Sequence, residues 1–119
     1  MDHQISLNDA AAMTARYRTN KDSILKTEYQ ELDLLPLCES FSIASVAAIF
    51  EQPDVTKLRV YYGMDSNYKI HAVLVGVDSN DADILPASAT SLTETEGVIL
   101  EDAQRCPPYC PPKSALNDD

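Results

Sequence analysis

The chain ends in a segment rich in proline and cysteine, and this segment constrains its conformation more than any other feature of the sequence. Residues 106–112 read Cys-Pro-Pro-Tyr-Cys-Pro-Pro and hold four of the seven prolines and two of the three cysteines. Proline fixes φ at about −65° and has no backbone N–H group, so it is excluded from helix interiors and inner strands. We therefore expect this tail to follow a polyproline II path or a series of turns.

The spacing of Cys106 and Cys110 leaves their pairing open. A polyproline II path would hold their Cα atoms roughly 12 Å apart, whereas a disulfide needs them within about 7 Å. A turn at residues 107–109, with a cis proline as one way to form it, would allow pairing. Together with Cys38 and His71, the two cysteines would also suffice for a zinc site of three thiolates and one imidazole. Simple packing of the tail, with its cysteines as small buried hydrophobes, is the plainer interpretation.

The composition predicts one globular domain. The chain has 119 residues, of which 45% are hydrophobic, which is enough for a core. The longest apolar run, residues 72–77, is far shorter than the roughly 20 residues of a membrane helix. The N-terminus lacks the basic and apolar regions of a secretory signal, which predicts a cytoplasmic protein. A net charge of −10 disfavours nucleic acid and membrane surfaces as partners.

One helix is predicted near the N-terminus. Ser6 and Asp9 form an S-x-x-D capping box, so the helix should begin at Leu7, and it should end near residue 20. Apolar or small residues recur along it with helical spacing and should face a core. These residues are Leu7, Ala10, Ala11, Thr14 and Tyr17.

A second helix is predicted over about 43–51. Ser42 is a favourable N-cap, and Pro53 disfavours helical geometry in the residue before it. Residues 23–39 show no clear period, and we interpret them as an extended connection that lies over the core.

The second half of the chain predicts strands. From Lys57 to Tyr62 the apolar residues alternate, and residues 69–77 are apolar on both faces, which is typical of an innermost strand. Residues 84–86 predict a short edge and residues 98–100 a further strand. Residues 87–96 are small, polar and aperiodic, which predicts a mobile surface loop.

The residue types that commonly carry catalysis are sparse. The three glycines are too far apart for either of the common glycine-rich nucleotide loops. His71 is the one serious candidate for a general base, and we interpret it as a histidine on a partly exposed sheet face beside Arg59 or Tyr61. The acidic stretch from Asp78 to Asp83 departs from a calcium loop at three positions, so a solvated turn is favoured.

Several blocks of sequence resemble a family of short bacterial proteins of unknown function. The blocks are R-x-Y-x-G-x-D at residues 59–65, V-G-V-D at 75–78, D-I-L-P at 83–86 and C-P-P-x-C at 106–110. The resemblance implies a single compact domain with an integral tail. It implies no activity, cofactor or partner, so no catalytic residue is carried over.

We expect an α+β fold in which two N-terminal helices pack on a small antiparallel sheet of three to four strands, with the tail packed against it. The single domain, residues 1–119, would comprise a helical part (1–56), a sheet part (57–102) and the tail (103–119). The predicted function is a non-enzymatic cytoplasmic interaction module, as a homodimer or with another protein, without a cofactor or an assigned metal ligand. The alternative is a thiol protein that binds metal or senses oxidation through Cys106, Cys110 and Cys38. An enzyme that uses His71 is the least favoured hypothesis.

Overall fold

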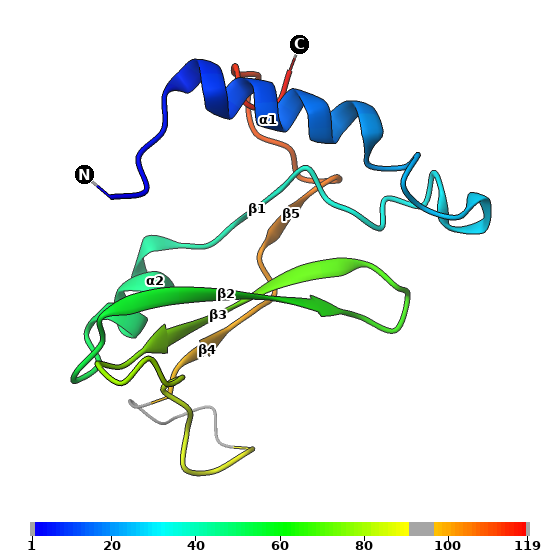
Figure 1. The fold of residues 1–119 in the computed structure, drawn as a ribbon. Coiled ribbons are helices and arrows are strands. Elements are labelled where there is room, and N and C mark those ends of the chain that lie inside the picture. Colours follow the sequence, from blue (N-terminus) through cyan, green and yellow to red (C-terminus); the bar gives the residue numbers. More distant parts are fainter. Residues whose placement is uncertain (1, 91–96, 119) are drawn as a thin grey trace. The chain divides into compact units, whose positions relative to one another are not determined.

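The computed structural model describes residues 2–90 and 97–118. These residues form two α-helices, a short 3-10 helix and two small antiparallel sheets, so the predicted α+β class is confirmed (Figure 1). The elements are α1 (Leu7–Asn20), η1 (Thr27–Tyr29), β1 (Cys38–Ser40), α2 (Ile43–Phe50), β2 (Lys57–Met64), β3 (Ile70–Val77), β4 (Ile99–Leu100) and β5 (Gln104–Cys106). Strands β1 and β5 form a two-stranded sheet, and the other sheet has the order β2-β3-β4.

The chain divides into two compact units, each of which is described by itself. One unit comprises Met1–Cys38 and Arg105–Asp119, and the other comprises Glu39–Gln104. The single domain over residues 1–119 stays a prediction, as does the packing of both helices and the tail on one sheet. No helix in the described part of the chain is long and apolar enough to cross a membrane.

Helix α1 begins and ends where the sequence predicts. The Ser6 side chain accepts a hydrogen bond from the backbone N–H of Asp9 at 3.0 Å, which satisfies one of the free amides of the first turn. The predicted apolar stripe is half-buried from Ala10 to Tyr17, but Leu7 is 63% exposed and the prediction is wrong there. Helix α1 has no fully buried residue.

The remainder of this unit consists of connecting segments and the tail. The Tyr17 hydroxyl donates to the carbonyl of Pro36 at 2.7 Å. The buried guanidinium of Arg105 donates from Nη2 to the carbonyls of Asp33 and Leu34, at 2.8 and 2.9 Å. The connection over residues 23–39, predicted as extended, instead contains the 3-10 helix η1. Because these contacts join residues far apart in the chain, local sequence patterns do not reveal them.

In the second unit, α2 packs on β3 and β4. Ser42 is its N-cap and accepts from the backbone N–H of Ser45 at 3.3 Å, as predicted. Ile49 is fully buried, and a Cβ atom added at Gly76 in β3 would lie 3.2 Å from its Cγ2. A side chain at position 76 would therefore push the helix away from the sheet, which is why glycine suits this strand position.

Strands β2 and β3 pair antiparallel from Lys57 opposite Val77 to Met64 opposite Ile70, which confirms both predicted strands and the central position of β3. The predicted edge at residues 84–86 is found one residue earlier, as a single bridge between Val77 and Asp83. The predicted strand at 98–100 is β4. The predicted loop over 87–96 falls largely on residues 91–96, which lie outside the described residues.

Candidate functional site

Within the unit Glu39–Gln104, the described residues leave the apolar side of β2 exposed. Side chains alternate across a strand, so the even-numbered residues of β2 share one face. Their exposed fractions are 40% for Leu58, 42% for Val60, 81% for Tyr62 and 62% for Met64. On the same face of β3 their register partners include Leu74 and Gly76, which are buried. Helix α2 thus covers the part of this face on β3 and leaves the part on β2 open to solvent.

The outer edge of β2 is also unpaired in the described residues, because this strand pairs with β3 alone. The backbone N–H of Asp65 donates to the carbonyl of Lys69 in continuation of the register, which makes this a hydrogen-bonded pair. Such pairs alternate along an antiparallel ladder, so the odd-numbered residues of β2 bond to β3. The N–H and C=O groups of the even-numbered residues therefore point to the free edge. An exposed edge with apolar side chains is a template for pairing with another chain.

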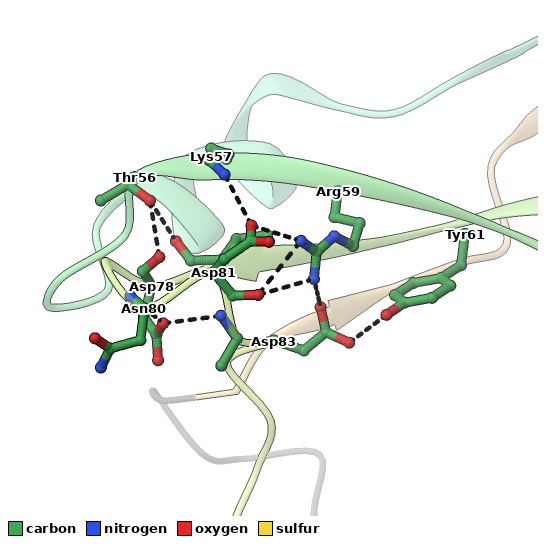
Figure 2. Close-up of polar contacts among 10 residues, drawn as sticks. Thr56, Lys57, Arg59, Tyr61, Asp78, Asn80, Asp81 and Asp83 are labelled. Atoms are coloured by element: carbon green, nitrogen blue, oxygen red, sulfur yellow. Dashed lines mark hydrogen bonds and ion pairs between the residues drawn. The ribbon is translucent and has the colours of Figure 1, made fainter.

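The opposite face of β2 carries a polar network, which Figure 2 shows. Arg59 donates from Nη1 to Asp83 Oδ1 at 2.6 Å and from Nη2 to Asp81 Oδ1 at 2.8 Å. Tyr61 donates its hydroxyl proton to the other carboxylate oxygen of Asp83. Lys57 Nζ lies 2.8 Å from Asp81 Oδ1. The side chains that extend from this face of β2 are therefore held by the segment that follows β3.

The network shifts the pKa of a hydrogen-bond donor, Tyr61, and the pKa of its two acceptor carboxylates in opposite directions. The hydrogen bond that Tyr61 donates to the Asp83 carboxylate raises the pKa of Tyr61. The hydrogen bond from Tyr61 is the largest cause that lowers the pKa of Asp83, and the hydrogen bond from Arg59 is the second. The hydrogen bond from Lys57 lowers the pKa of Asp81. Asp81 and Asp83 are thus ionised at neutral pH and pair with both cations of β2.

The acidic segment after β3 is a turn, as predicted, rather than a calcium loop. Asp78 Oδ1 accepts from the backbone N–H groups of Asn80 and Ala82, at 2.8 and 3.0 Å. This Asx-type bonding holds the turn together (Figure 2). Asp81 and Asp83 then point to the cations of β2. In the described residues, no group of three or more histidine, cysteine or acidic side chains is arranged to hold a metal ion.

His71 lies between carboxylates. Its Nε2 is 2.8 Å from Asp65 Oδ2, its Nδ1 is 3.1 Å from Glu39 Oε2, and Glu101 Oε1 lies 3.8 Å from the same nitrogen. Ionised carboxylates only accept hydrogen bonds, so both ring nitrogens of His71 donate and the ring offers no free lone pair with which to act as a general base. Its partners are these acidic residues rather than Arg59 or Tyr61, the neighbours that the sequence suggested.

The carboxylates favour the charged form of the ring. The hydrogen bond to Asp65 is the largest effect on His71 and raises its pKa, and the hydrogen bond to Glu39 acts in the same direction. Burial lowers the pKa of His71 but does not outweigh these two contacts. The same contact lowers the pKa of Asp65. Glu39 is nearly buried and also accepts from the backbone N–H of Ala72 at 2.6 Å, so it takes the place next to β3 where β4 has ended. This cluster fastens the hairpin end of the sheet to β1.

The Cys-Pro tail contains a disulfide between Cys106 and Cys110, whose Cα atoms are 4.5 Å apart. The chain turns between them, with cis peptide bonds before Pro107 and Pro108, so the extended polyproline II path is not adopted. Cys106 is buried whereas Cys110 is exposed, and Cys38 is a free thiol. Two of the three thiolates that the zinc hypothesis required are thus used in the disulfide.

A cavity of ≈ 450 Å³ lies between the N-terminus of α2 and the segment after β4. Its lining residues include Ser42 and Ser45 at the start of α2 and the acidic residues Glu101 and Asp102. The helix N-terminus favours an anion, whereas the two carboxylates favour a cation. These opposing preferences select no class of ligand.

Two residues with structural importance carry no signal in the sequence. Gln52 is buried, and its Oε1 accepts from the backbone N–H groups of Gly97 and Val98 at 2.6 and 3.0 Å. Glu39 is the other, since it joins β1 to His71 and Ala72. In both cases the hydrogen-bond partners lie more than thirty residues away in the chain. The sign that marks Gln52 and Glu39 is the burial of a polar side chain, which is visible only in the structure.

Comparison with known proteins identifies no match: no family model, no curated protein and no solved structure is similar to this chain.

Proposed function

We propose that this protein is a non-enzymatic interaction module that binds an extended protein segment along the edge of β2. The single observation that carries the proposal is the coincidence of two features on one strand. The even-numbered residues of β2 present exposed apolar side chains, and the ladder alternation turns their free backbone groups to the same edge. A partner strand gains main-chain hydrogen bonds from the edge and specificity from the side chains.

The polar network supports this role by removing the usual protection of an edge strand. Lysine and arginine on an edge normally discourage pairing with another chain, because their charges would be desolvated. Here Lys57 and Arg59 are paired with Asp81 and Asp83 on the opposite face. Their charges are therefore held away from the apolar side of the strand.

The test is a substitution that removes only the free edge. Val60→Pro deletes an outward-pointing N–H group and keeps every bond from β2 to β3, while Val60→Thr keeps the N–H group and the β-branched shape. Each variant, immobilised at equal density, is incubated with the lysate of the source cell. A partner retained by the original protein and by Val60→Thr but lost by Val60→Pro supports the proposal. Retention of the same proteins by Val60→Pro would contradict it.

A second function is favoured by the disulfide. In a reducing cytoplasm, the predicted compartment, disulfides are uncommon unless they take part in redox chemistry. We propose as the alternative that Cys106 and Cys110 act as an oxidation sensor. A low-molecular-weight disulfide accepts two electrons and two protons from the two thiols and leaves as two thiols, while the Sγ–Sγ bond forms. The exposure of Cys110 makes it the sulfur that an incoming thiolate reaches in the reverse reaction.

The alternative is tested by equilibrating the protein in glutathione buffers of graded potential and counting free thiols by mass spectrometry. A midpoint within the cytoplasmic glutathione range, together with unchanged titration of Cys38, supports a sensor. A disulfide that stays formed at the most reducing potentials is structural, and the alternative then fails.

A further inference from the structure

We infer that the partner of the β2 edge is a second copy of this chain, which adds its own β2 antiparallel across a two-fold axis and joins two three-stranded sheets into one. The inference rests on the proposed function, because it names the segment that the edge binds. It is supported by the complementarity between the residues of β2 and those of a second, antiparallel β2.

The pleat restricts the registers that are available. Two antiparallel strands in one sheet are related by a two-fold axis perpendicular to that sheet, so directly opposite residues must lie on the same face. An even-numbered residue of β2 therefore faces an even-numbered residue of the second copy. On the two-fold axis, one residue must lie directly opposite the same residue of the second copy. Val60 and Tyr61 are the two residues in the middle of the strand that can take this position.

The register centred on Tyr61 uses the whole strand. It places Leu58 opposite Met64 of the second copy and Val60 opposite Tyr62 of the second copy. All of these are residues whose backbone groups point to the free edge, so each pair exchanges main-chain hydrogen bonds. Centring on Val60 would place Met64 opposite Thr56, which lies before the strand begins. The register centred on Tyr61 therefore pairs more of the backbone N–H and C=O groups at the free edge of β2.

Charge complementarity favours the same register. Lys57 then lies opposite Asp65 of the second copy, and both are on the face that carries the polar network. Lys57 already contacts Asp81 and Asp65 already contacts His71, but their side chains are still 59% and 37% exposed, so each can reach a further partner. Opposite charges on directly facing residues stabilise a strand pair, whereas like charges oppose it. Lys57 begins β2 and Asp65 directly follows its last residue, so opposite charges at the two ends of this segment suit antiparallel pairing with itself.

The apolar side chains gain cover from the same arrangement. Because the two-fold axis preserves the faces of the sheet, the apolar residues of both β2 strands lie side by side in one patch. Tyr62 is the most exposed of them and would pack beside Val60 of the second copy, an aromatic and β-branched pair of the kind that stabilises sheets.

The first experiment measures the oligomeric state of the purified protein by sedimentation velocity over a range of concentrations. We expect a monomer–dimer equilibrium in the original protein and in Val60→Thr, and a dissociation constant at least about tenfold higher in Val60→Pro, which loses a hydrogen bond on each side of the axis. A monomer at every concentration would overturn the inference. A dimer that Val60→Pro leaves unchanged would overturn it as well.

The second experiment fixes the register. In a Cys38→Ser background, Tyr61→Cys places two thiols opposite each other in a non-hydrogen-bonded pair, where the Cα atoms are about 4.5 Å apart and a disulfide forms readily. Val60→Cys is the matched control, because its thiols would lie on a diagonal roughly 7–8 Å apart. We expect covalent dimer from Tyr61→Cys and at least about tenfold less from Val60→Cys. Preferential cross-linking of Val60→Cys would overturn the register.

The two proposals fail in distinguishable ways. A protein that stays monomeric but retains a lysate partner in a manner sensitive to Val60→Pro contradicts the dimer and supports the interaction module. Absence of both the dimer and an edge-dependent partner contradicts both.

Discussion

The apolar face of the three-stranded sheet has two parts with opposite environments. On β3, Leu74 and Gly76 lie under α2 together with the fully buried Ile49, whereas on β2 the facing residues Val60 and Leu58 remain exposed. The two parts lie on one face of the same sheet, where Val60 is opposite Leu74 and Leu58 is opposite Gly76. The comparison teaches that an apolar strand face marks a surface to be covered but does not say which molecule covers it.

The covered part should show the largest effect on folding. Ile49→Ala removes a fully buried side chain between α2 and the sheet, and we expect it to lower the free energy of unfolding by about 2–5 kcal/mol. Urea unfolding measures this loss. A loss no greater than that of an exposed substitution would mean that α2 does not cover the sheet as described.

Gln52→Ala should have the next largest effect, because it leaves the N–H groups of Gly97 and Val98 without their acceptor at the border of the covered part. We expect a loss of about 1–3 kcal/mol in the free energy of unfolding, the usual result of an unsatisfied buried donor. Gln52→Glu, which keeps an acceptor at this position, is the informative control. Equal stability of the alanine variant and the original protein would contradict these hydrogen bonds.

The cluster at the hairpin end of β2 should make stability depend on pH. The pKa of His71 is raised in the folded state, chiefly by Asp65, so its contribution is complete below the ordinary histidine pKa and is lost as pH rises through the folded value. The pKa of Asp65 is lowered, so its contribution is present above the ordinary aspartate pKa and is lost as pH falls through its folded value.

Urea midpoints measured across pH will show this effect. In the original protein, stability should fall as pH rises through the folded pKa of His71, and we expect His71→Gln to reduce this fall. The control His3→Gln should leave the urea midpoints unchanged, since His3 is exposed near the chain terminus. An unchanged profile in His71→Gln would show that the carboxylate contacts do not contribute to stability.

The uncovered part should show the smallest effect on folding and a clear effect on association. Tyr62→Thr changes an exposed side chain, so the free energy of unfolding of the monomer should change by less than about 0.5 kcal/mol. Dimerisation should weaken in sedimentation experiments at the same time, because the cross-strand contact is lost. A large loss of monomer stability would mean that this face is already covered within the chain.

Much of the local structure could be predicted from short stretches of sequence. The capping residues Ser6 and Ser42 placed the starts of both α-helices, alternation placed β2, and a run that is apolar on both faces placed β3. The candidate site was harder to predict. The alternation along β2 was visible in the sequence, but period two alone does not distinguish a face covered by a helix from an open one.

The disulfide illustrates the same limit. The sequence of the tail excluded helix and inner strand, yet it left open the pairing of Cys106 and Cys110, which the structure joins by a disulfide. The pairing depends on whether the chain turns between the two cysteines, and a spacing of four residues fits both a turn and an extended path.

By itself the sequence determined the helices, the two long strands and the alternation of apolar residues along β2, because these depend on caps, proline and side-chain period within a few residues. The tertiary structure alone decided that α2 covers β3 rather than β2, that Arg59 pairs with Asp83 and that His71 lies between Glu39 and Asp65. These contacts join residues that are distant in the chain. Their geometry depends on how whole elements pack, and no local pattern encodes it.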